Sequence, residues 1–122
     1  MFQLKNIELY NEALGLNESL EKVANDLPRN TYFLANLLKK AAGSIPSDIA
    51  EGQAQKGYLE KKNYFWAAWN SIREASNWIE VAARQGFIDE ETRNGFRSKL
   101  HDLSGQVQNL IRNSSSVEVS KN

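Results

Sequence analysis

Apolar residues recur along most of this chain in alternating steps of three and four, the spacing that places them on one face of an α-helix. Four such stretches follow one another, and alternating runs typical of strands are absent from the sequence. The pattern therefore predicts an all-α protein, an antiparallel up-and-down four-helix bundle. The predicted core positions are Leu9, Ala13, Leu16, Leu20, Val23 and Leu27 in the first helix, Leu34, Leu38, Ala41, Ile45 and Ile49 in the second, Phe65, Trp69, Ile72, Ser76, Ile79 and Ala83 in the third, and Phe96, Leu100, Leu103, Val107 and Leu110 in the fourth.

Residues that end or begin helices lie between these stretches. Leu27 precedes Pro28 and ends the first helix, since a residue before proline avoids the helical conformation. Gly52 is predicted to end the second helix in a left-handed conformation, and Gly86 to end the third. Asp89 is a good N-cap for the fourth helix. The short turns make consecutive helices antiparallel neighbours.

The second helix carries a proline in its interior. Pro46 removes one backbone donor and displaces the carbonyl of Ala42, which costs about 3 kcal/mol in an ordinary helix. Gly43 leaves room for a bend, and Ser44 and Ser47 can donate hydrogen bonds to the loosened backbone. The sequence therefore predicts a proline-bent second helix.

The chain has 122 residues, enough for one domain with its own core. Residues 114–122 do not continue the apolar stripe of the fourth helix. We therefore expect the bundle to span residues 1–113 and residues 114–122 to form a disordered tail. The sequence has no cysteine, which excludes disulfides and thiolate chemistry and fits a cytoplasmic location. The N-terminus is too charged for a signal peptide, and the longest apolar run is too short to span a membrane.

The 15 basic and 15 acidic residues cancel, so the total charge does not favour nucleic acid. Two basic residues stand against five acidic ones in residues 1–27, and six against three in residues 28–62. The alternation repeats, with two against five in residues 63–91 and five against two in residues 92–122. Either helices of opposite charge attract one another within the bundle, or a basic segment forms a face for a partner.

No catalytic or metal-binding pattern is recognisable. His101 is the only histidine, which excludes the paired Glu-x-x-His motifs of a di-iron bundle, and we expect it on the solvated side of the fourth helix. Asp48 and Glu51 lie three residues apart and could share a metal or a proton. Alternatively, they accept hydrogen bonds from the loosened backbone or from Arg73. We expect no enzymatic activity, no metal and no cofactor.

Two groups of surface residues are candidates for contacts with partners. Basic residues near Tyr58 and Tyr64 suit phosphates and stacked bases, although a solvated surface explains them equally without a ligand. Trp66 and Trp78 point away from the predicted stripe of the third helix, so we expect them at an interface between subunits; otherwise they lie half exposed at the bundle edge. The basic set is Lys39, Lys40, Lys56, Lys61 and Lys62.

Residues 39–52, KKAAGSIPSDIAEG, resemble the hallmark of a bacterial four-helix bundle family, the 23S rRNA intervening sequence proteins. That hallmark reads basic-basic-Ala-Ala-x-Ser-Ile/Val-Pro-Ser-Asn-Ile-Ala-Glu-Gly, and the resemblance extends over about residues 5–113. Asp48 stands where the family usually has Asn. The resemblance implies that six motif residues have structural or subunit-contact roles. These are Ser44, Pro46, Ser47, Asp48, Glu51 and Gly52.

The resemblance also implies a homo-oligomer, a ring-shaped pentamer. Related accessory proteins of diversity-generating retroelements bind nucleic acid and assist a reverse transcriptase. The leading hypothesis is therefore an RNA- or DNA-associated accessory protein that uses the basic set. The alternative is a scaffold that binds protein partners through the third helix and binds no nucleic acid. Neither hypothesis involves a membrane.

Overall fold

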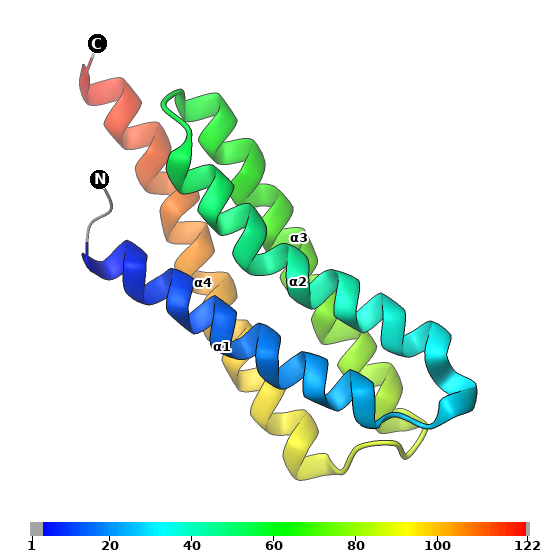
Figure 1. The fold of residues 1–122 in the computed structure, drawn as a ribbon. Helices are drawn as coiled ribbons and strands as arrows, with labels where there is room; N and C mark the ends of the chain where they lie inside the picture. Colours follow the sequence, from blue (N-terminus) through cyan, green and yellow to red (C-terminus); the bar gives the residue numbers. More distant parts are fainter. Residues whose placement is uncertain (1–3, 122) are drawn as a thin grey trace.

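The computed structural model describes the backbone of residues 4–121 and the side chains of residues 6–114. This part of the chain contains four long helices and no strand, so the predicted all-α four-helix fold is confirmed. Figure 1 shows consecutive helices running in opposite directions along one another. The helices are α1 (Leu4–Asp26), α2 (Tyr32–Ala54), α3 (Tyr58–Arg84) and α4 (Glu90–Lys121), and a short 3-10 helix, η1 (Arg29–Thr31), lies between α1 and α2.

The core follows the predicted stripes closely in α1, α2 and α4. In α1 and α4 the differences are shifts by one residue, since Ala24 is buried in place of Val23 and Ile111 in place of Leu110, and α2 buries Ala42 and Pro46 in addition to its predicted stripe. In α3 the predicted Trp69 and Ser76 lie at the edge of the core, and small residues take the central positions. This helix packs against both α2 and α4, and alanines allow close approach on two sides. The buried residues of α3 are Phe65, Ala68, Ile72, Ala75, Ile79 and Ala82.

The α3–α4 turn has the predicted chemistry. Gly86 adopts a positive φ of 81°, and its N–H donates to the carbonyl of Ala83 at 3.0 Å. The N–H of Phe87 donates to the carbonyl of Ala82 at 2.9 Å, which completes a Schellman motif. Asp89 then accepts a hydrogen bond from the backbone N–H of Thr92 at 2.8 Å, so it caps α4.

Helix α2 continues through Pro46, which is buried. Ser44 Oγ donates to the carbonyl of Lys40 at 2.9 Å, one of the serine contacts expected beside the proline. Ser47 is exposed. The size of the bend at Pro46 stays a prediction.

The predicted role of Gly52 is wrong. This glycine lies inside α2, which ends at Ala54, and among the described glycines only Gly86 has a positive φ. A Cβ atom built on Gly52 would lie 2.6 Å from Cδ1 of Phe65, well inside van der Waals contact. Gly52 is therefore required because α2 and α3 approach each other here, not because the chain turns.

Helix α4 passes the predicted end of the bundle at residue 113. Ser114 is buried, and its Oγ donates to the carbonyl of Leu110 at 2.7 Å, so it belongs to the bundle. No proline or glycine follows Gly105 to stop the helix, and the backbone stays helical to Lys121. The structure thus differs from the predicted tail at residues 114–121, while the side chains of residues 115–121 and all of residue 122 lie outside the described residues.

Candidate functional site

The motif of residues 39–52 divides between an inner and an outer face of α2. Ile45, Pro46, Ile49 and Gly52 are buried, and they follow one another at the spacing of one helix face. Gly52 meets the ring of Phe65 on α3. The inner half of the motif therefore joins α2 to α3 and offers nothing to a ligand.

The outer half of the motif carries two carboxylates. Burial raises the pKa of Asp48, and the neighbouring charge of Glu51 raises it further. Arg73, the partner considered for these carboxylates, lies instead over the ring of Trp69, with its guanidinium carbon 5.1 Å from the ring centroid. Among the described residues no group of three or more His, Cys, Asp or Glu side chains could hold a metal ion.

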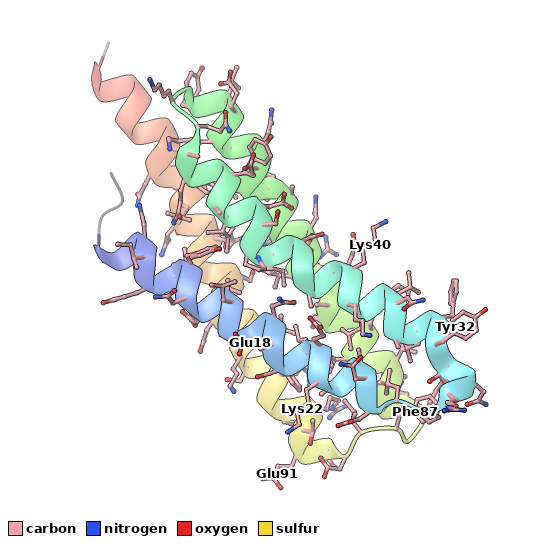
Figure 2. The ribbon with its side chains drawn as sticks, viewed as in Figure 1. Glu18, Lys22, Tyr32, Lys40, Phe87 and Glu91 are labelled. Atoms are coloured by element: carbon pink, nitrogen blue, oxygen red, sulfur yellow. The ribbon has the colours of Figure 1, made fainter. Side chains whose placement is uncertain are left out.

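The lysines of the basic set lie at two levels of the bundle. Lys40 is exposed on α2, as Figure 2 shows, and Lys39 beside it is half-buried. Lys56 is exposed in the α2–α3 connection, and Lys62 is half-buried on α3. From Lys40 to the end of α2 the helix rises about 21 Å, so the structure does not gather the five lysines into one patch.

Lys61 has a structural contact. Its ammonium donates hydrogen bonds to the carbonyls of Gly52 and Gln53, both at 3.2 Å. These carbonyls belong to the last turn of α2, where a cation is favoured by the partial negative charge of the helix end. Lys61 therefore ties the start of α3 to the end of α2.

Aromatic and basic side chains follow one another on the outer side of α3. Trp66 is 42% exposed, and its ring meets the ring of Trp69 edge to face, with centroids 5.4 Å apart. Arg73 covers Trp69 one turn further along. The three side chains form a continuous surface, which we call the tryptophan–arginine row.

Trp78 lies in a different environment. It is half-buried and packs against both apolar clusters of the bundle, the smaller of which consists of Leu27, Leu34 and Ala82. Its Nε1 atom is buried and has no hydrogen-bond partner among the described residues. Trp66 and Trp78 therefore do not form one surface of this chain, and of the two only Trp66 is largely open to a partner.

The comparisons with known proteins bear on this arrangement. The model of the 23S rRNA-intervening sequence protein family matches residues 5–109. The chain belongs to this family. A similar solved structure is the crystal structure of a protein of unknown function from the S23 ribosomal protein family of Bacteroides thetaiotaomicron VPI-5482. The two folds superpose with a TM-score of 0.82 at 14% identity, covering 89% of this chain and 99% of that chain.

At this identity the likeness shows the fold alone. No curated protein matches the chain. Among the described residues, no helix combines the length and the apolar character needed to cross a membrane. The buried half of the motif packs α2 against α3 in this chain, so the exposed surface is left to indicate function.

Two exposed features of this family member were not predicted. Tyr32 and Phe33 lie side by side in sequence at the start of α2 and are 70% and 69% exposed (Tyr32 is labelled in Figure 2). Four arginines of α3 and α4 also line one hollow, described below. The charges of α3 and α4 were counted along the chain, and only the packing of the two helices brings them together.

Proposed function

We propose that this protein is a non-enzymatic homo-oligomer, a pentamer, that associates with RNA or DNA as an accessory protein in the cytoplasm. Membership of a family named for the 23S rRNA intervening sequence supports the association with nucleic acid. The observation that carries the proposal is the exposed basic position at Lys40, within a segment that matches the family hallmark. A reverse transcriptase is the protein partner that the resemblance favours, and no cofactor is required.

In this proposal the lysines bind phosphates at two levels. Lys39 and Lys40 contact the nucleic acid at the middle of α2, and Lys56 and Lys62 contact it near the α2–α3 connection. Lys61 adds charge at that second level while its ammonium is held by the end of α2. Because phosphate contacts release counterions, affinity should fall steeply as salt rises.

The test is the mass of the particle in solution, measured by light scattering with and without a short RNA hairpin at about 50 mM and about 200 mM salt. We expect a pentamer-sized particle that gains mass with RNA at low salt and loses this gain at high salt. A monomer would overturn the assembly, and a particle that ignores RNA at both salts would overturn the association.

A charge reversal tests the basic set. The double change Lys39→Glu, Lys40→Glu should abolish the gain in mass with RNA and leave the oligomer intact. The matched control is Lys22→Glu, Lys99→Glu, which changes the net charge equally at exposed positions of α1 and α4. Equal loss in both double variants would show that total charge, not this surface, decides binding.

A second candidate function is a scaffold that binds protein partners and no nucleic acid. Its support is the exposed aromatic surface at Tyr32, Phe33 and Trp66, since large exposed apolar side chains mark interaction sites. Under this hypothesis Lys39→Glu, Lys40→Glu changes nothing, whereas Phe33→Ser removes binding of a protein partner. An oligomer that ignores RNA at low salt would favour the scaffold over the accessory protein.

A further inference from the structure

The surface between α3 and α4 contains a hollow of about 420 Å³ in which positive charge is concentrated. Four arginines line it, two from each helix, against a single carboxylate, that of Glu80. The remaining lining is mostly neutral and polar. We call this feature the arginine hollow, and its arginines are Arg73, Arg84, Arg93 and Arg97.

Glu80 is the only acidic side chain in the lining, and two arginines already share it. Its Oε2 accepts hydrogen bonds from Arg84 Nε at 2.9 Å and from Arg93 Nη1 at 3.4 Å. The hydrogen bond from Arg84 lowers the pKa of Glu80, and the charges of Arg93 and Arg97 lower it further. Glu80 is therefore ionised at neutral pH, and it is one carboxylate against four guanidinium groups within the lining, while Glu90 lies outside the lining at 4.0 Å from Arg93 Nη2.

Arg93 holds a donor that nothing in the described part of the chain accepts. Its side chain is 25% exposed, and its Nη2 reaches Asn94 Oδ1 at 3.3 Å and Glu90 Oε1 at 4.0 Å. Its Nε is buried and makes no hydrogen bond to any described group. A buried charged N–H without an acceptor is costly, so a shift of the Arg93 side chain that brings this atom to an anion in the hollow would relieve that cost.

Phosphate is the acceptor that suits such a site. A guanidinium group donates in a planar fork that matches two phosphate oxygens, and arginine is favoured over lysine where that geometry matters. Several arginines around one hollow can donate to a tetrahedral anion from different sides. Asn77, which also lines the hollow, adds an amide that can donate to the same anion.

The tryptophan–arginine row leads directly to the hollow. Arg73 belongs to both, and Trp66 lies seven residues before it, about 10 Å along the helix axis. An exposed indole at this distance can stack on a base whose neighbouring phosphate lies in the hollow. This arrangement suits a single strand, whose bases are free to leave their own stack.

We propose that the arginine hollow binds a phosphate group, and that in the proposed function this group belongs to a single-stranded nucleic acid whose base stacks on Trp66. The inference rests on the proposed function for the source of the phosphate, and it adds a contact on α3 and α4 to the contacts of the lysines of α2. A free phosphate ion is the other source of the same chemistry.

The first test is fluorescence anisotropy with a labelled single-stranded uridine oligonucleotide at about 50 mM salt. The double change Arg93→Gln, Arg97→Gln should weaken binding about tenfold or more and flatten its salt dependence. The control Arg29→Gln, Lys99→Gln removes the same charge from exposed positions outside the hollow and should change binding by about twofold at most. Equal effects of the two double variants would overturn the proposal.

A second variant predicts an effect of the opposite sign. Glu80→Gln frees Arg84 from its carboxylate and leaves Arg93 only the 4.0 Å contact with Glu90, so it should tighten binding of the oligonucleotide several-fold. A role of Glu80 limited to joining α3 and α4 predicts lower thermal stability without tighter binding. Unchanged or weaker binding by a folded Glu80→Gln variant would therefore contradict the site.

The third measurement reports on the site directly and separates the two sources. The Nε–H resonance of Arg93 is followed by NMR while inorganic phosphate or the oligonucleotide is added at constant ionic strength. Movement with both probes supports a nucleic-acid phosphate, and movement with inorganic phosphate alone supports the hollow while refuting the proposed function. Binding of RNA by the wild type with this resonance unmoved overturns the inference and leaves the proposed function standing.

Discussion

Replacing Gly52 by alanine tests the close approach of α2 and α3. The new Cβ would lie 2.6 Å from Phe65 Cδ1 and closer still to Cε1, so the ring or a helix must move. Phe65 is only 2% exposed and belongs to the main core, so the ring has no open space into which it can rotate. Overpacking of this kind costs about 1–3 kcal/mol.

The substitution also brings a gain that must be separated from this cost. Alanine is favoured over glycine in a helix interior by about 1 kcal/mol. Gly43 lies in the same helix, and a Cβ there would meet nothing within 4 Å, so Gly43→Ala measures this gain alone. The two variants should therefore differ by about 1–3 kcal/mol, with Gly52→Ala the less stable.

The assay is urea unfolding followed by far-UV circular dichroism, with all variants at one protomer concentration because an oligomer's stability depends on it. A double-mutant cycle with Phe65→Leu, which removes part of the ring's bulk, should give a coupling of about 0.5–3 kcal/mol in favour of the double variant. If Gly52→Ala and Gly43→Ala were equally stable, the close approach would not be the reason for the glycine.

Three further outcomes are expected. Asp48→Asn should raise stability at neutral pH by at most about 0.5 kcal/mol, because it removes a partly buried charge beside Glu51, and the gain in urea unfolding should fade as the pH falls through the raised pKa of Asp48. Asp89→Ala should lower the midpoint of urea unfolding at neutral pH. Because hydrogen bonds from the Thr92 hydroxyl and N–H lower the pKa of Asp89, this difference should persist below the usual aspartate range and disappear once the pH falls through the lowered value. Trp66→Ser decides between the subunit interface predicted from the sequence and the base stacking proposed above: we expect an unchanged particle mass in light scattering, and a lower mass would place Trp66 between subunits and contradict the stacking.

Periodicity predicted the four helices and most of their inner faces because burial on a helix repeats every three or four residues. The core of α3 was predicted less well. Large apolar side chains such as Trp69 were placed at its centre, whereas Ala68 and Ala75 hold that position. A helix between two neighbours needs small residues where both approach, and this requirement depends on the neighbours rather than on the helix itself.

Gly52 is a second position at which local sequence was not enough to predict the structure. A glycine near a helix end is typical of a left-handed C-cap, and Gly86 fits this rule. At Gly52 the deciding neighbour is Phe65, thirteen residues later and on a different helix. Local sequence cannot distinguish a glycine that turns the chain from one that makes room for a side chain of another helix, because the second role depends on tertiary packing.

The arginine hollow explains why charge counted along the chain was a poor guide to the surface. Residues 63–91 carry two basic against five acidic residues, yet both of these arginines, Arg73 and Arg84, line the hollow, while of the acidic side chains only Glu80 does. Arg93 and Arg97 join them because α4 follows α3 after a tight turn at Gly86 and packs along it. A segment that is acidic in total therefore supplies half of a basic site. Charge along a helix predicts function only after its neighbour is known, since a ligand meets the face that two helices share.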